Sequence, residues 1–105
     1  KMNRAASFDE FARVWRPNDW NHFRIRCVGR LPLITTWING LVICELDSSK
    51  IDLPGFDAEQ VFHRLGRSGH IGFEVHDVSL KNPLGQDRWA VGAVCRWRNL
   101  SLQEL

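Results

Sequence analysis

The chain has 105 residues and a 44% share of hydrophobic residues, which suits one modest globular domain. Its formal net charge of +2 is too small for a surface that follows a nucleic-acid backbone. No apolar run approaches the roughly 18 residues that a membrane-spanning helix needs. We therefore expect neither a nucleic-acid partner nor a membrane span.

The first predicted element is a short helix between Ser7 and Pro17. Ser7-Phe8-Asp9-Glu10 has the form of a capping box, in which the side chains of the first and fourth residues bond to each other's backbone N–H groups. Apolar side chains follow at helical spacing, and the helix must end before the proline. We expect its apolar side to cover a sheet edge.

Over residues 21–28, apolar and polar residues alternate with a period of two, which is typical of a strand with one face exposed to solvent. Its two faces would carry Phe23, Ile25 and Cys27 on one side and Arg24 and Arg26 on the other.

Asn39-Gly40 stands between the apolar runs 33–38 and 41–46, and is the strongest two-residue hairpin signal. A type I′ turn would pair Ile38 with Leu41, Trp37 with Val42 and Thr36 with Ile43. That register places Trp37, Val42 and Cys44 on one face.

The second half of the chain predicts a short helix followed by two more strands. Asp57-Ala58-Glu59-Gln60 resembles another capping box, and Gly66 can provide the left-handed cap that ends the helix. Strands are expected over residues 71–78 and 94–103, with a loop over residues 80–88. The whole pattern favours an all-β fold, most simply an antiparallel β-sandwich with two short helices. A single sheet would leave one apolar face open, so missing N-terminal strands or a partner chain must cover it.

The three cysteines, Cys27, Cys44 and Cys95, lie on separate strand-like segments without the close spacing of a zinc or redox motif. We interpret them as small buried apolar residues. One pair could form a disulfide if the protein is exported, and the sequence leaves this open.

Glu74 and His76 are the candidate pair for proton transfer. Residues i and i+2 of a strand project from the same face, roughly 7 Å apart at the ~3.3 Å rise per residue. A carboxylate and an imidazole at this spacing can act as acid and base on one substrate. The structural alternative is an edge carboxylate and a hydrogen-bonded core histidine. We expect no cofactor; a divalent metal on Glu74 and His76 is the alternative, without Asp77, which would point to the other face.

Arg98 and Trp37 have both functional and structural interpretations. The guanidinium of Arg98 can hold a hydroxyl or stabilise a developing negative charge on oxygen, or it can simply bridge a neighbouring carboxylate. Trp37 can stack on a pyranose ring, although a tryptophan on a hairpin more often packs in the core.

Four sequence blocks together resemble the C-terminal part of the 3-keto-disaccharide hydrolase family, whose fold is a concanavalin-like sandwich. The blocks are residues 20–25, 38–41, 69–76 and 97–100, and the resemblance runs from about Trp15 to Leu105. Gly69 to His76 follows the family's order of glycine, isoleucine, glycine and histidine. Glu74 stands where the family commonly has glutamine, so His76 ranks first as the candidate base. The family's domain has further strands before the match, so residues 1–105 are expected to form one incomplete sandwich domain.

The resemblance implies cleavage of a 3-keto-glycoside by proton abstraction, elimination and hydration, with a carbohydrate or glycoside as substrate. His76, Glu74 and Arg98 would be catalytic, and Trp37, Arg96 and Trp89 would bind the sugar. It also implies a periplasmic or secreted location. One alternative is a lectin-like glycan-binding module without catalysis, and another is a non-enzymatic interaction domain that uses the second hairpin face as a dimer interface.

Overall fold

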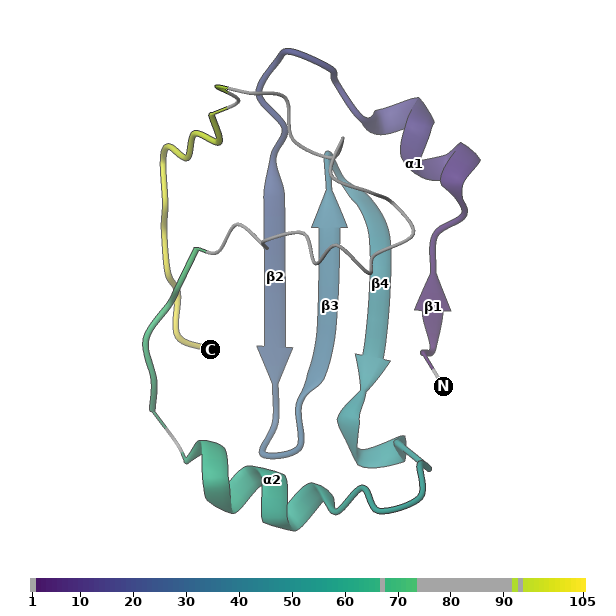
Figure 1. The fold of residues 1–105 in the computed structure, drawn as a ribbon, viewed down its shortest axis with the longest axis vertical. Helices are drawn as coiled ribbons and strands as arrows, with labels where there is room; N and C mark the ends of the chain where they lie inside the picture. The colour runs from purple at the N-terminus through teal and green to yellow at the C-terminus, as the bar shows by residue number, and fades with distance from the viewer. Residues whose placement is uncertain (1, 67, 74–91, 93) are drawn as a thin grey trace. The chain divides into compact units, whose positions relative to one another are not determined.

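The structure is a computed structural model that describes residues 2–66, 68–73, 92 and 94–105. The chain divides into two compact units, residues 1–69 and residues 70–105. In the described residues of the first unit, four strands form one antiparallel sheet in the order β1-β4-β3-β2 (Figure 1). The strands are β1 (Arg4–Ala5), β2 (Phe23–Val28), β3 (Leu33–Ile38) and β4 (Leu41–Asp47). The helices are α1 (Phe8–Val14), η1 (Ser48–Lys50), which is a 3₁₀ turn, and α2 (Ala58–Leu65). This is the predicted fold class, a partial all-β sandwich with little helix.

Helix α1 begins and ends as the sequence predicts. The Ser7 side chain accepts the N–H of Glu10 at 3.2 Å, and the Glu10 carboxylate accepts the N–H of Ser7 at 2.8 Å. The capping box is therefore complete. Phe11 and Trp15 stack on the same side of the helix, with ring centroids 5.4 Å apart. The helix packs beside β4, at the β1 side of the sheet, as Figure 1 shows.

The β3–β4 hairpin has the predicted type I′ turn. Asn39 and Gly40 both have positive φ, +49° and +87°, which is the backbone geometry that such a turn requires and that glycine adopts at low cost. Ile38 pairs with Leu41 and Trp37 with Val42, as predicted.

The predicted register is wrong beyond these two pairs. Thr36 pairs with Cys44 instead of Ile43, because a bulge in β4 inserts one extra residue between consecutive pairs. Cys44 consequently lies on the face of Thr36 and not on the face of Trp37. The Ile43 carbonyl accepts the N–H of Ala6 at 2.8 Å, next to the short strand β1, which the sequence did not predict.

The two faces of the sheet differ in chemistry. On β2, the apolar and the charged residues lie on opposite faces, as predicted. Phe23 and Ile25 pair with Ile38 and Thr36 of β3. Phe23 and Ile25 remain 48% and 56% exposed, and no apolar side chain in the described residues is fully buried. Such a half-covered apolar face is typical of the inner face of a sandwich. A second layer of strands, or a partner chain, that covers it remains a prediction.

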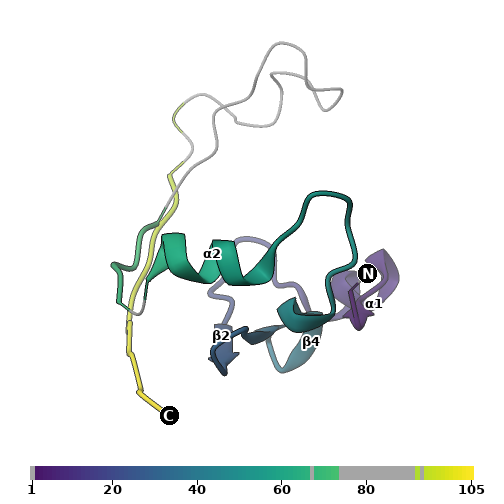
Figure 2. The same cartoon turned by 90° about the horizontal axis from the view of Figure 1, so that it is seen from below.

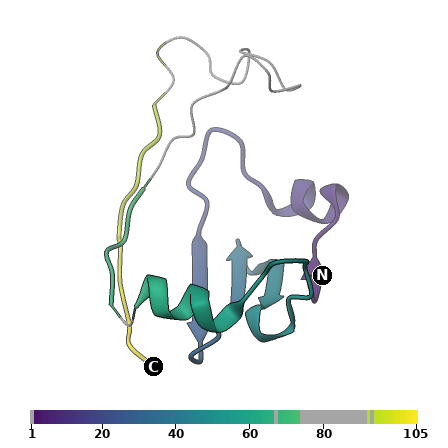
Figure 3. The same ribbon diagram turned by 60° about the horizontal axis from the view of Figure 1, so that its bottom comes forward.

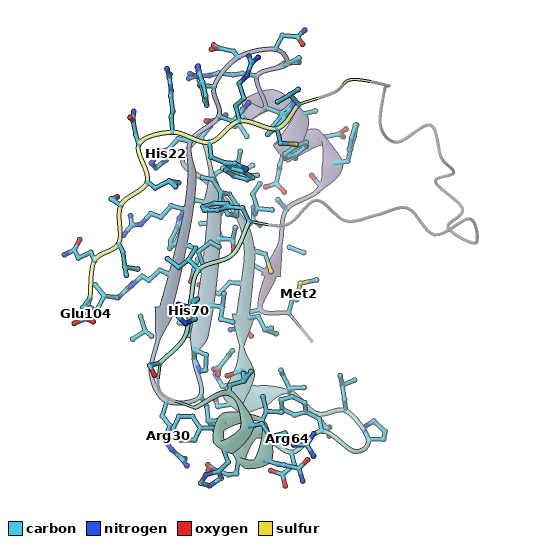
Figure 4. The ribbon with its side chains drawn as sticks, turned by 60° about the vertical axis from the view of Figure 1, so that its left-hand side comes forward. Met2, His22, Arg30, Arg64, His70 and Glu104 are labelled. Atoms are coloured by element: carbon cyan, nitrogen blue, oxygen red, sulfur yellow. The ribbon has the colours of Figure 1, made fainter. Side chains whose placement is uncertain are left out.

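Helix α2 is fastened to the β2–β3 turn at one end of the sheet. Its N-cap Asp57 accepts the N–H of Gln60 at 3.0 Å, and Gly66 ends it with φ +72° and ψ −165°, a region open essentially only to glycine and different from the expected left-handed helical cap. Figures 2 and 3 show α2 beside the strand ends. Figure 4 places Arg30 of the turn beside this helix, and His22 at the opposite end of β2.

The predicted strands of the second unit are not found in its described residues. Residues 71–73 and 94–103 have no strand pairing, and the remainder of the first predicted strand, residues 74–78, lies outside the described residues. A strand requires ladder hydrogen bonds to a neighbour, which an alternating sequence alone does not supply. Asn99 also has φ +54°, which interrupts an extended backbone.

Candidate functional site

The polar face of the sheet carries charged side chains and one large aromatic ring. The register sets Arg24 of β2 opposite Trp37 of β3, and Arg26 opposite Thr35. Thr35 is in turn opposite Glu45 of β4. Cross-strand partners project from the same side of a sheet, so these five side chains form one continuous surface, the polar face.

Trp37 is the one predicted sugar-binding residue of the first unit, and Arg24 lies over it. The Arg24 guanidinium carbon is 4.9 Å from the centroid of the indole ring. This distance is within the range of a cation–π contact, which is worth about 0.5–1 kcal/mol at an exposed site. Trp37 is half-buried and Arg24 is exposed, so the pair offers a partly accessible indole ring together with a charged guanidinium group.

Thr35 lies at the centre of the polar face and is only 6% exposed, the one buried polar residue among those the structure describes. Its hydroxyl donates a hydrogen bond to Glu45 Oε2 at 3.3 Å. Its cross-strand partners are Arg26 and Glu45, and the hydrogen bond draws the Glu45 carboxylate toward β3. The face is therefore organised around a short residue between an arginine and a glutamate.

The conspicuous Asn39 of the hairpin turn has a structural role. Its Nδ2 group donates to the Val14 carbonyl and to Asn21 Oδ1, both at 2.7 Å. Its Oδ1 accepts the N–H of His22 at 2.8 Å, and its own N–H donates to the His22 carbonyl at 2.9 Å. One amide side chain thus joins the hairpin, the end of α1 and the start of β2.

Asn21 extends this network into the loop between α1 and β2. Its Oδ1 accepts the N–H of Arg16 at 2.9 Å, and its Nδ2 donates to the carbonyls of Arg16 at 2.8 Å and Asp19 at 3.1 Å. Two of the four family-like blocks therefore meet through asparagine side chains. The hydrogen bonds of these two asparagine side chains therefore stabilise the fold.

In the second unit, the other two family-like blocks also meet. Phe73 and Trp97 lie with ring centroids 4.7 Å apart and tilted planes. Arg96 and Arg98 flank Trp97 in the sequence, and both are exposed. This places an aromatic pair next to the predicted enolate stabiliser Arg98.

Three predicted site residues, Glu74, His76 and Trp89, lie outside the described residues. Trp37 belongs to the first unit, whereas Arg96 and Arg98 belong to the second. The sequence analysis did not single out Arg24, Arg26, Thr35 or Glu45 as functional. The signal that could have found them was the alternation in β2, combined with the turn over residues 29–32 that joins β2 to β3 and sets Trp37 opposite Arg24.

Among the described residues, the clearest pKa shifts belong to surface side chains whose hydrogen bonds stabilise the fold. Hydrogen bonding from the Ser7 N–H and from Arg4 lowers the pKa of Glu10 to about 2. A hydrogen bond from Arg30 lowers the pKa of Glu59. Among the described residues, no group of three histidine, cysteine or carboxylate side chains is arranged to hold a metal ion. The proposed metal alternative on Glu74 and His76 falls outside these residues.

Comparison with known families identifies one match over nearly the whole chain. Residues 3–103 match the family described as the 3-keto-alpha-glucoside-1,2-lyase-like domain. No curated protein and no solved structure gives a match. No helix in the described part of the chain has the length and apolarity to cross a membrane. Because the match covers far more than half of the sequence, the chain belongs to the 3-keto-alpha-glucoside-1,2-lyase-like family, a family of carbohydrate-active domains related to 3-keto-glycosides.

Proposed function

We propose that this domain cleaves the glycosidic bond of a sugar that carries a ketone at C3. The observation that carries the proposal is the family match over residues 3–103, whose name specifies lyase chemistry on a 3-keto-glucoside. The polar face of the sheet supports it, because Trp37 and Arg24 there offer an aromatic surface and hydrogen-bond donors suited to a sugar.

The chemistry follows from the ketone. A carbonyl at C3 acidifies the proton on C2, so a base can remove it and leave an enolate whose charge lies on the C3 oxygen. The electron pair then forms a C1–C2 double bond, the C1–O bond breaks, and the aglycone leaves as an alkoxide that takes up a proton. Addition of water across C1–C2 returns the free 3-keto sugar. Elimination alone is lyase activity, and elimination with hydration is net hydrolysis.

His76 is the proposed base, with Glu74 as its acid–base partner, because imidazole and carboxylate exchange protons near neutral pH. Arg98 is the proposed stabiliser of the enolate oxygen, since a guanidinium offers charge and directed donors to a developing oxyanion. Trp37, Arg96 and Trp89 would bind the sugar. The catalytic assignments rest on the family-like blocks over residues 69–76 and 97–100, and the sugar-binding assignments rest on the chemistry of the side chains.

The test is turnover of an aryl 3-keto-glucoside, with aglycone release followed by absorbance and C2 proton exchange followed by NMR in D₂O. We expect His76→Ala to lower kcat about 10²–10⁴-fold and to abolish exchange at C2, in line with loss of a general base. His63→Ala is the matched control, because His63 lies on α2 and is exposed. Wild-type turnover in His76→Ala would remove this residue from the mechanism.

A glycan-binding module is the second candidate, and the Arg24–Trp37 pair favours it because that pair can bind a sugar without any acid or base. The same experiment separates the two functions. Binding of the 3-keto-glucoside by calorimetry, with neither C2 exchange nor aglycone release, would replace the enzyme with the binding module.

A further inference from the structure

The polar face contains two adjacent cationic side chains on one strand. Arg24 and Arg26 are separated by one residue on β2, so they project from the same face about 7 Å apart at the ~3.3 Å rise per residue. Both are exposed, and β2 is the last strand on its side of the sheet that the described residues form. Like charges this close repel each other, a cost that an anionic ligand would remove.

Neither arginine has a carboxylate partner among the described residues. The ion pairs found there use other cations: Arg4 binds Glu10, Arg30 binds Glu59 and Lys50 binds Asp47. The carboxylate in the same cross-strand row as Arg26 is Glu45. It lies two strands away, with Thr35 between them, and accepts the hydroxyl of Thr35. Within the described part of the chain, the local charge on the β2 side of the face is therefore positive.

Trp37 orients one of these two cations. Its ring lies against the Arg24 guanidinium, with 4.9 Å from the guanidinium carbon to the ring centroid. A guanidinium that lies over an aromatic ring still has N–H groups available for an acceptor. Less side-chain entropy is then lost when a ligand binds, because the aromatic contact already restricts the rotamers of Arg24.

We propose that Arg24, Arg26 and Trp37 form a subsite for the carboxylate of an acidic saccharide, such as a uronic acid unit. The paired N–H donors of an arginine guanidinium match the planar geometry of a carboxylate. The edge of Trp37 can contact the sugar ring that carries this carboxylate. This inference rests on the proposed function, because it assigns to the same carbohydrate-active domain a substrate or aglycone that bears a negative charge.

The test compares methyl β-glucuronide, methyl β-glucoside and inorganic phosphate as probes, with the 105-residue chain in calorimetry. We expect the glucuronide to bind at least about tenfold more tightly than the glucoside, the gain typical of a charge-assisted hydrogen-bond pair. Arg24→Gln and Arg26→Gln should each remove most of this preference. Arg24→Lys keeps the positive charge but lacks the paired N–H donors of the guanidinium, so it should retain only part of the preference for glucuronide.

Arg64→Gln is the matched control, because Arg64 is an exposed arginine on α2. Circular dichroism and thermal melting check that each variant remains folded. Equal affinity for glucuronide and glucoside, or equal effects of Arg24→Gln and Arg64→Gln, would overturn the inference. Phosphate binding as tight as glucuronide binding would also overturn it, since the site would then recognise any anion. Turnover of a neutral 3-keto-glucoside, measured on the same protein, tests the proposed function separately.

Discussion

Asn39 and Asn21 are hydrogen-bonded through their side chains, with 2.7 Å between Asn39 Nδ2 and Asn21 Oδ1. The bond joins the β3–β4 turn to the loop that precedes β2, 18 residues earlier in the chain. Each asparagine also bonds to backbone groups of the same region. The pair acts as a clamp that holds the end of α1, the start of β2 and the hairpin together.

Asn39→Asp should destabilise the domain by about 1–3 kcal/mol, because it leaves the turn intact while replacing two donated hydrogen bonds with oxygen–oxygen repulsion. Aspartate tolerates the positive φ of a type I′ turn nearly as well as asparagine. The measurement is urea denaturation of both proteins, followed by tryptophan fluorescence.

Asn18→Asp is the control for this change. Asn18 also has a positive φ, +58°, and lies in the loop that Asn21 anchors. The same chemical change there should leave the free energy of unfolding nearly unaltered. Equal losses in both variants would mean that the clamp contributes nothing beyond the added charge.

Arg30→Lys should loosen α2 from the β2–β3 turn. Arg30 Nη1 donates to Glu59 Oε1 at 2.6 Å, Nη2 donates to Glu59 Oε2, and the guanidinium carbon lies 4.2 Å from the centroid of the Phe62 ring. Lysine cannot reproduce this fork or the flat stacking contact. Because the pair is half exposed, only a small fall in Tm is expected. Hydrogen exchange of the α2 amides should accelerate, whereas Arg64→Lys should leave it unchanged.

Acid should weaken the N-terminal capping box. The pKa of Glu10 falls from an ordinary 4.5 to about 2 in the folded chain. A depressed folded-state pKa means that the contribution is complete above pH 4.5 and is lost as the pH falls toward 2. Glu10→Gln should flatten the dependence of stability on pH in this window, and Glu104→Gln should not. Identical acid denaturation curves for wild type and Glu10→Gln would contradict the assignment.

Cys27 and Cys44 should not form a disulfide with each other. Strand β3 separates their strands, because Cys27 pairs with Ile34 and Cys44 pairs with Thr36. Two strand spacings separate their Cα atoms by about 10 Å, beyond the ~7 Å limit for a disulfide. In a Cys95→Ser variant treated with oxidised glutathione and then unfolded, mass spectrometry should find no peptide that links the two. Such a linked peptide within one chain would require a different order of strands in the sheet.

Local sequence patterns were sufficient for the elements that depend on near neighbours. The capping box at Ser7, the Asn39-Gly40 turn and the alternation in β2 all follow from side chains within a few residues of each other. The bulge in β4 and the short strand β1 were missed because they arise from pairing with distant backbone. The predicted strand over residues 94–103 is absent for a related reason, since alternation does not supply a hydrogen-bonding neighbour.

By itself, the sequence determined the all-β class, the hairpin and the family blocks, because periodicity and turn chemistry are local properties of the chain. The tertiary structure alone decided which side chains share a face. It set Arg24 against Trp37, placed Thr35 between Arg26 and Glu45, and moved Cys44 to the apolar face. The physical reason is register: a shift of one residue in strand pairing moves every later side chain to the opposite face, and only the assembled sheet fixes that choice.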